Sequence, residues 1–436
     1  MGARSCFLVL SLLAAVSACS GYRSTVLPRL AITGEYTDNV GQDETNPQSD
    51  VINTVSPGVT YSLTGATRGL TLSYDPSLAY HAEREESFST RHAATLNAYD
   101  QMTRASRFEL RDSFTLTDDP TPTRDPTFQR TDEPAPTEDT TIRRGTEPYY
   151  TNFANARFLH RFGPTDLFFL AYTHSMLQNE DPNLEDNTRH IPEAGVTYYF
   201  NPRYGIEANA RYSRGDFSGE GETVSDSINE LYMRSRLIRR FSPRLGLFVQ
   251  YALTRMAFEG NDPDYQVHDV SVGFDYNPSE TVSVSMGGGY FYRTIDDGDP
   301  TGGYVVRGDM AKRFARGAVR LSGGIGYDQA FYGAENLGFT EFHEILVAGT
   351  YEFTRTLSGE VSASYRNSSY TDVADREDTV AAFLAGLNYR LRPWLLASLR
   401  YVHRTVDSNQ VGGGYDENRV SLSLTMVPAT PFILNR

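Results

Sequence analysis

The sequence predicts an all-β fold: a transmembrane, antiparallel, up-and-down β-barrel of about 20 strands, with 18 or 22 strands as alternatives. Two observations predict it. Turn-forming segments recur about every 38 residues, and the segments between them alternate apolar and polar side chains. A helical repeat would instead place apolar residues three and four positions apart, and none of the repeats does so.

The turns divide each repeat into two long segments. Each repeat holds two runs of about 11 residues, joined by a short turn at one end and by a longer acidic or glycine-rich loop at the other. A propeller blade would need four short strands per repeat, so the pattern favours hairpins of two long strands. The turns are centred on Ala66, Arg104, Pro164, Pro202, Pro243, Pro278, Arg316, Arg355 and Pro393.

The alternation also distinguishes two faces of each strand. Leucine and valine hold alternate positions in 245–254 and 418–426, and mostly small or polar residues lie between them. Strands of about 9–11 residues match a tilted crossing of a bilayer and exceed the usual length in soluble sandwiches. Lipid offers the backbone no hydrogen bonds, so such a sheet must close on itself, with its apolar face outward.

Aromatic residues gather at both ends of the expected strands, as anchoring at the two membrane interfaces requires. The short turns are then expected in the periplasm, and the acidic loops outside. Phe162, Phe200, Phe241, Tyr276, Phe314, Phe353 and Tyr389 stand close to the short turns, and Tyr290, Tyr292, Tyr327, Tyr365 and Tyr401 stand near the far ends.

One outward loop is much longer than the rest. Residues 118–148 are rich in proline, threonine and aspartate, and they account for the single interval of 60 residues between turns. A loop of this length either narrows the barrel interior or extends outside it. The segment has few apolar residues that would anchor it inside, which favours an external flap.

The N-terminus has the features of a secretion signal. Residues 1–18 combine one positive charge, an apolar core and small residues before Cys19. Ordinary cleavage and lipidation of Cys19 are alternatives. We expect a short periplasmic segment at 19–26, an integral bacterial outer-membrane barrel at 27–427 in contact with lipid and lipopolysaccharide, and a tail at 428–436.

The composition argues against several classes of function. The formal net charge of −15 does not fit a nucleic-acid partner, which would need a basic face. The eight histidines are scattered without metal-binding or catalytic spacing, so we expect no enzyme, no metal site and no cofactor.

Arginine is frequent on the face that would line the barrel interior. Either these arginines pair with acids on neighbouring strands, or they favour anionic solutes in a pore. The candidate pore-lining residues are Arg157, Arg211, Arg234, Arg236, Arg240, Arg307, Arg313, Arg320, Arg366, Arg390 and Arg400.

The segments 33–40 (TGEYTDNV), 55–63 (VSPGVTYSL) and 69–81 (GLTLSYDPSLAYH), with 418–426 (NRVSLSLTM), resemble the first and last strands of a family of outer-membrane β-barrel porins. Members of that family often accompany bacterial exopolysaccharide export systems. Most such barrels end on an aromatic residue, whereas this chain continues through VPATPFILNR. Two alternatives remain open: Phe432 takes the place of the terminal aromatic residue, or the tail is a periplasmic extension.

Three functions follow as hypotheses. The first is an outer-membrane conduit for polar or anionic solutes, with the resemblance implying the port of a polysaccharide secretion system and a periplasmic export partner. The alternatives are a general diffusion porin for small nutrients and a plugged structural or adhesive surface barrel.

Overall fold

The computed structural model describes residues 21–84, 87–120, 145–219, 227–260, 262–296, 298–330, 337–371 and 376–435. Among these residues, no helix is long and apolar enough to cross a membrane. The strands are β1 (Arg23–Thr37), β2 (Asp50–Thr64), β3 (Arg68–His81), β4 (Phe88–Asp100), β5 (Ser106–Thr117), β6 (Tyr149–Arg161), β7 (Leu167–Asn179), β8 (Asp186–Asn201), β9 (Tyr204–Ser218), β10 (Ile228–Ser242), β11 (Leu245–Phe258), β12 (Tyr265–Ser279), β13 (Val282–Ile295), β14 (Thr301–Phe314), β15 (Gly317–Ala330), β16 (Gly338–Glu352), β17 (Leu357–Tyr370), β18 (Arg376–Arg392), β19 (Leu395–Ser408), β20 (Tyr415–Met426) and β21 (Phe432–Asn435).

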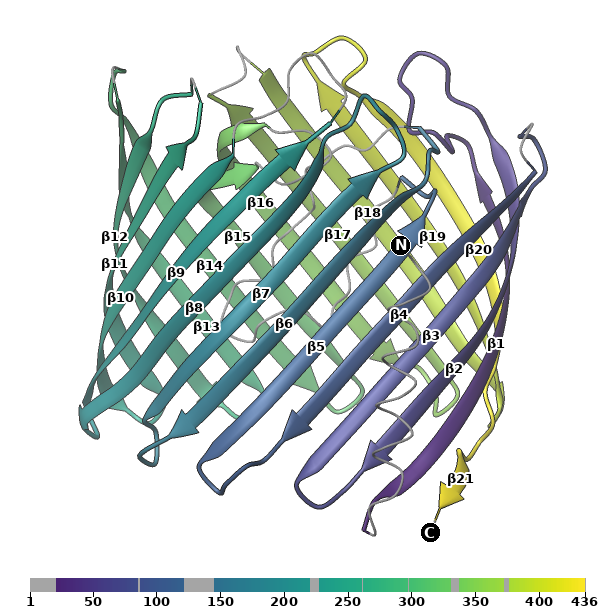
Figure 1. Cartoon of the computed structure of the whole chain (residues 1–436), viewed down its shortest axis with the longest axis horizontal. Coiled ribbons are helices and arrows are strands. Elements are labelled where there is room, and N and C mark those ends of the chain that lie inside the picture. Colours follow the sequence, from purple (N-terminus) through teal and green to yellow (C-terminus); the bar gives the residue numbers. More distant parts are fainter. Residues whose placement is uncertain are drawn as a thin grey trace.

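The strands close into a barrel. From β1 to β20 each strand pairs antiparallel with the next, and β1 also pairs with β20, from Leu30↔Met426 to Thr37↔Arg419. Figure 1 shows the tilted strands, with the short turns along the lower rim and the longer loops above. The prediction of a closed antiparallel barrel of about 20 strands is therefore confirmed.

The proline turns fall on the rim of short turns. Pro202, Pro243 and Pro393 lie between paired strands, and Pro278 lies near the end of β12, just before its turn. The strands are longer than the sequence analysis assumed, with 12 residues in β5 and 17 in β18. About 9–11 residues suffice to cross the hydrocarbon core, so the additional residues extend the wall beyond it.

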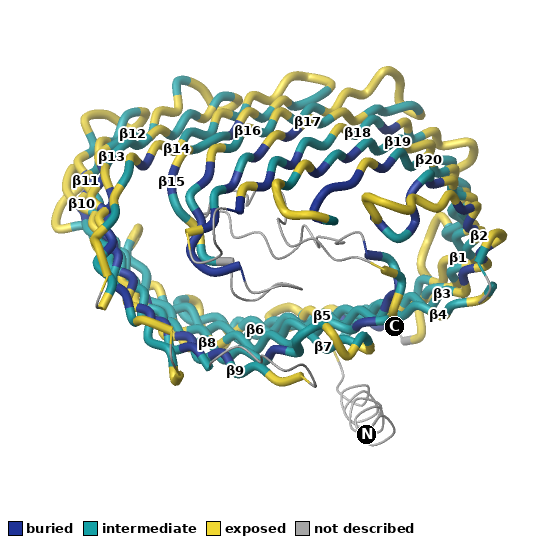
Figure 2. The backbone as a smooth tube through the Cα atoms, turned by 90° about the horizontal axis from the view of Figure 1, so that it is seen from above, coloured by how far each residue is buried: buried dark blue, intermediate teal, exposed yellow. Residues whose placement is uncertain are grey.

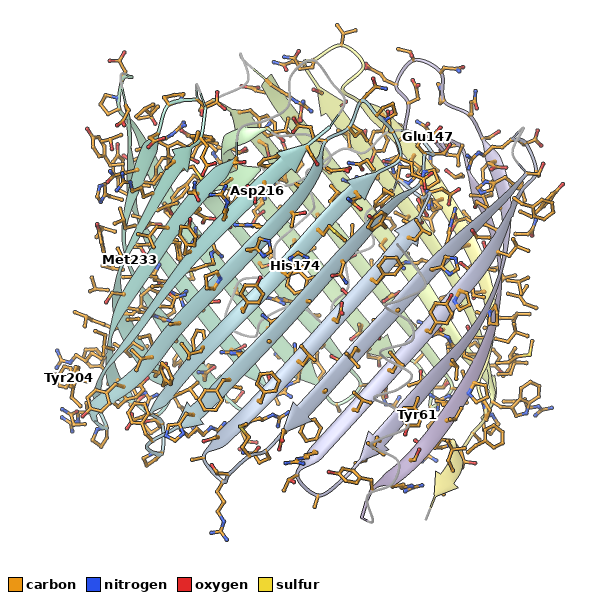
Figure 3. The ribbon with its side chains drawn as sticks, in the orientation of Figure 1. Tyr61, Glu147, His174, Tyr204, Asp216 and Met233 are labelled. Carbon is orange, nitrogen blue, oxygen red and sulfur yellow. The ribbon has the colours of Figure 1, made fainter. Side chains whose placement is uncertain are left out.

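The two faces of the wall follow the alternation. On β10 and β11, Leu237 and Val249 point outward with 56% and 52% of their surface exposed, and they are direct partners across the two strands. Figure 3 shows Met233 at the outer edge of the same part of the wall. Such exposed apolar residues ring the barrel, which is the arrangement that lipid contact requires.

The aromatic belts occupy both ends of this outer face. Phe162, Phe200 and Phe241 are more than 49% exposed beside the short turns. Toward the far end, Tyr290 and Tyr292 are 50% and 45% exposed on β13. Tyr327 departs from the expected belt, because its ring packs on Phe291 instead, with centroids 4.8 Å apart.

Both ends of the barrel differ from the expected boundaries. β1 begins at Arg23, so residues 23–26 of the expected periplasmic segment belong to the wall. The tail also contributes, because β21 pairs with β1 through Val26↔Phe432. β20 covers only the upper part of β1, and β21 supplies hydrogen-bonding partners for its lower part, which satisfies backbone groups at the edge.

Candidate functional site: the barrel interior

The interior enclosed by the ring of strands, the lumen, is the candidate site. Figure 2 views this ring from above. The eleven candidate arginines all lie on the face opposite the exposed apolar residues, as Arg236 on β10 does next to the outward Leu237. The alternation therefore places them on the lumen wall.

Four of these arginines are neutralised by acids on neighbouring strands. Arg236 contacts Asp275 and lies 3.7 Å from Glu207. Arg320 pairs with Asp309 at 2.7 Å, an inter-strand ion pair inside the wall. The other two pairs are Arg211 with Glu230 at 2.9 Å, and Arg366 with Glu344 at 3.1 Å and with Asp328 at 3.4 Å.

Three more arginines are held by rings or by the backbone. The Arg157 guanidinium lies 4.5 Å from the Phe169 ring centre, and Arg240 lies 3.8 Å from that of Tyr199. Such cation–π contacts stabilise the charge without cancelling it. Arg313 donates to the Glu280 carbonyl oxygen at 3.0 Å.

The remaining four, Arg234, Arg307, Arg390 and Arg400, form no side-chain hydrogen bond or ion pair with any described residue. Arg307, Arg390 and Arg400 are exposed, and Arg234 is half-buried. Glu230, the acid on the same strand face as Arg234, is occupied by Arg189 and Arg211. The lumen wall thus carries positive charge that the described acids do not pair.

The outer ends of β15 and β16 leave the wall and fold into the lumen. β14 pairs with β15 only as far as Val306↔Ile325, although both strands continue. Beyond this point Phe339 reaches β12 and β13, with its ring 5.9 Å from that of Tyr265 and 6.0 Å from that of Phe291. Figure 2 shows β15 inside the ring.

An apolar cluster holds this folded hairpin in place. Phe339 is fully buried, and the Arg293 guanidinium stacks 4.2 Å from its ring centre. Arg293 also donates to the Thr371 hydroxyl at 2.9 Å, which joins β13 to the end of β17 across the hairpin. Apolar burial stabilises such contacts by roughly 1.5–3 kcal/mol per large side chain. The cluster comprises Ile228, Met256, Tyr265, Val267, Phe291, Val305 and Phe339.

The base of the long loop also lies inside the barrel. Asp118 is 4% exposed, its carboxylate accepts from Arg84 at 3.1 Å, and it also pairs with Arg91. His81 Nε2 lies 3.5 Å from the same carboxylate. The neighbouring Asp119 reaches Arg419 on β20 at 2.9 Å.

These contacts place residues 118–119 against the inner wall, whereas the composition had favoured an external flap. Ionic anchoring, which apolar content does not reveal, draws the start of the loop inward. Residues 121–144 of the loop lie outside the described residues, as does Cys19 with the rest of 1–20.

The Asp118 carboxyl has a perturbed pKa. Burial alone would raise it, but the hydrogen bond from His81 and the charge of Arg91 outweigh burial, so the pKa is lowered below its usual range. A lowered folded-state pKa means that the charged carboxyl stabilises the fold above the unfolded pKa of about 3.9, and that this contribution is lost as the pH falls through the folded value.

Replacing Asp118 with asparagine should therefore lower the free energy of unfolding by about 1–3 kcal/mol at pH 7, because two half-buried guanidinium groups lose their buried carboxylate partner. The difference from the native protein should persist down to about pH 4 and shrink below it. Urea titration of the refolded barrel measures this. Glu147→Gln is the control, because Glu147 is exposed at the same rim (Figure 3) and should change stability by less than about 0.5 kcal/mol. A difference that stays constant down to pH 2 would show that the ion pairs of Asp118 with Arg84 and Arg91 are not the source of the stability.

Among the described residues, no group of three histidine, cysteine, aspartate or glutamate side chains is arranged to hold a metal ion. The site is instead the inner face of the barrel wall, which carries charged side chains, whereas the outer face is apolar. A closed barrel with an apolar outer surface has the architecture of an integral protein of the bacterial outer membrane.

Residues 341–427 match a family described as "Putative beta-barrel porin 2". The match covers most of β16 and all of β17 to β20, and it includes the closing strand whose resemblance to porins was noted from the sequence. That resemblance is confirmed. None of the curated proteins matches the chain.

One solved outer-membrane barrel shares the fold over most of the chain, and two others align with it at lower TM-scores. The FrpB iron transporter from Neisseria meningitidis aligns with 92% of this chain and 82% of its own, at 10% identity and a TM-score of 0.54, which shows a shared fold. OpdK of Pseudomonas aeruginosa, solved with vanillate, aligns with 92% of this chain and 98% of its own at 12% identity and a TM-score of 0.43. OccAB4 of Acinetobacter baumannii aligns with 94% of this chain and 99% of its own, at 11% identity and a TM-score of 0.41.

Sequence reasoning found the arginines of the lumen but missed two other parts of the site. The inward hairpin carries Tyr327 and Phe339 in the same phase as outward residues, so alternation alone places them on the wrong face. One signal was present: Ile228, Met256 and Val267 are apolar on an inward face, which indicates that something packs against them. The ion network around Asp118 gave no comparable signal.

Proposed function

We propose that the protein is a general diffusion porin for small polar solutes, with a weak preference for anions. The observation that carries the proposal is the surplus of positive charge on the lumen wall, where Arg307 and Arg400 are exposed and Arg234 is half-buried without an ion-pair partner among the described residues. Rings of charged side chains tune which ions enter a pore.

The folded hairpin supports a size limit as well. It brings Tyr265, Phe291 and Phe339 together inside the ring and occupies part of the interior. A narrowed pore brings solutes closer to the wall, where charge acts over distances shorter than the screening length of about 10 Å at 0.1 M salt. We therefore expect selection of small hydrophilic solutes by both size and charge.

Replacing Arg234, Arg307 and Arg400 together with glutamine should reduce the anion preference, because three unpaired charges leave the wall. Reversal potentials across a salt gradient in planar bilayers measure this. The native channel should pass anions over cations by a small factor at low salt, and the triple variant should approach equal permeability or favour cations.

A matched control removes the same number of charges outside the lumen. Arg203, Arg244 and Arg316 are exposed in the short turns, so their replacement by glutamine should change the reversal potential much less. A native channel that prefers cations, or equal shifts in both triple variants, would show that the lumen arginines do not set selectivity.

The polysaccharide port is not supported by the comparisons, and the general porin accounts for them better. We further propose that the outer face contacts lipid and lipopolysaccharide, since apolar residues such as Leu237 and Val249 are exposed on it, and that the protein is not an enzyme.

A further inference from the structure

Two apolar furrows cross the lipid-facing surface in the half of the barrel nearest the short turns. The first has a volume of about 790 Å³ and spans β9 to β14. The second has a volume of about 680 Å³ and spans β14 to β19. Tyr204, which lines the first, lies at the lower outer edge of the wall in Figure 3.

Both furrows are built by the same arrangement of side chains. In the first, Gly288 lies in register between Val272 and Val306 on the neighbouring strands. In the second, Gly349 lies in register between two further valines, Val319 and Val361. The valines are 40–58% exposed, so the missing side chain between each pair leaves a depression between two apolar walls.

A cation stands beside each furrow. Arg239 lies two residues before Phe241, with its guanidinium 4.5 Å from that ring centre and 5.6 Å from the ring centre of Tyr204. Lys312, the only lysine in the chain, lies two residues before Phe314, with its ammonium 5.0 Å from the ring centre. Phe241 and Phe314 line the first and second furrow respectively.

Neither cation has an acidic partner in the part of the chain that the structure describes. Arg239 and Lys312 are exposed, and neither forms a side-chain hydrogen bond or ion pair with a described residue. A charge on the lipid-facing side of a barrel is costly near the bilayer centre and tolerated near the interface. Aromatic belts mark that interface, so each cation sits at the level of lipid headgroups.

The short turns of outer-membrane barrels face the periplasm. The furrows therefore face the inner leaflet, which consists of glycerophospholipids with a phosphate at the interface and apolar chains below it. Guanidinium and ammonium groups bind phosphate oxygens through charge-assisted hydrogen bonds. At each furrow the cation thus matches the phosphate of a glycerophospholipid, and the apolar depression matches its acyl chains.

We propose that each furrow binds one glycerophospholipid of the inner leaflet. One acyl chain lies in the depression between the paired valines, and the phosphate contacts Arg239 at the first furrow or Lys312 at the second. The site is independent of solute passage through the lumen.

The test is native mass spectrometry of the refolded barrel in detergent, titrated with dioleoylphosphatidylglycerol. The native protein should retain up to two molecules at low lipid concentration. Dioleoylglycerol has the same chains without the phosphate and should be retained much less.

Two substitutions separate the roles of chain and headgroup. Gly288→Leu fills the first furrow, and an added Cβ there would meet only the Val305 carbonyl oxygen, at an ordinary 3.7 Å, so the fold should persist. The retained number should fall from two to one. Arg239→Gln should weaken binding at the first furrow about fivefold, the contribution typical of one basic residue at a membrane surface.

Each substitution has a matched control on the same outer surface. Gly34 is an exposed, lipid-facing glycine on β1, away from both furrows, where an added Cβ would meet only Asn53 Oδ1 at 3.6 Å, so Gly34→Leu should leave two lipids bound. Arg255 is exposed near the opposite rim, so Arg255→Gln should not change the affinity.

Three results would overturn the proposal: equal retention of both probes, two lipids still bound by the leucine variant of Gly288, or equal weakening by Arg239→Gln and Arg255→Gln. Heat-modified migration on gels checks that each variant is folded. Should the variant at Gly288 fail to fold, the arginine pair and the two probes still decide the question.

Discussion

Replacing Arg419 with glutamine should lower the free energy of unfolding by about 3–5 kcal/mol, the cost typical of removing one partner from a buried ion network. Arg419 lies on the inner face of β20 with 12% of its side chain exposed. Its guanidinium reaches Glu417 at 2.7 Å, Asp119 at 2.9 Å and Glu35 at 3.3 Å. Without it, three buried or half-buried carboxylates would face one another without a positive charge between them.

The position of the network explains why the effect is large. It joins β1 and β20, the two strands that close the barrel, to the start of the long loop. Glu417 additionally accepts from the Thr37 hydroxyl at 2.9 Å and from Gln42 at 3.1 Å. Loss of the arginine therefore weakens the seam and the loop attachment together.

Equilibrium urea titration of folding into phospholipid vesicles measures the change. Arg400→Gln is the matched control, because Arg400 lies on the neighbouring strand β19 and also points into the lumen. Arg400 is exposed and has no ion-pair partner among the described residues. It should change stability by less than about 0.5 kcal/mol. Adding Glu417→Gln to the Arg419 variant should recover part of the loss, and equal effects at Arg419 and Arg400 would refute the network.

Replacing Val249 with arginine should cost about 2–4 kcal/mol of stability, because it places a charge against the lipid near the middle of the wall. Val249 is 52% exposed on the outer face and lies between the two aromatic belts. The next residue along β11, Gln250, points into the lumen and pairs with Ser271 and Arg236 in register. Gln250→Arg should therefore be mild.

Val249→Arg and Gln250→Arg place the same side chain on the same strand at almost the same depth in the membrane. The two variants therefore differ mainly in whether the arginine points to the lipid or to the lumen. The measured quantity is the folded fraction after assembly into vesicles, followed by the urea midpoint. Similar losses for both variants would show that the two faces of the wall are assigned wrongly.

The parts of the fold that depend on local sequence were predictable. Alternation of period two shows which face of each strand is apolar, and the proline or glycine turns show where each hairpin turns. Both are local features of a single hairpin, so counting the hairpins along the chain gives the number of strands and the rim on which the turns lie. Leu237, Val249 and Leu422 accordingly face outward as expected, and the eleven arginines face inward.

Contacts between distant strands were not predictable in the same way. Glu230 shares a strand face with Arg234 but pairs with Arg189 and Arg211 from the two preceding strands, and only the register between strands decides this. The inward fold of the β15 and β16 hairpin likewise depends on where pairing with β14 stops, after Val306↔Ile325, which no local pattern encodes.

The most direct test of the central claim is the conductance of the purified native barrel in a planar bilayer with a salt gradient. The account predicts stepwise, persistent openings and a reversal potential that shows a weak anion preference at low salt, which fades as salt rises because screening shortens to about 3 Å at 1 M. A folded barrel that adds no conductance to the bilayer would contradict the account and favour a plugged surface protein.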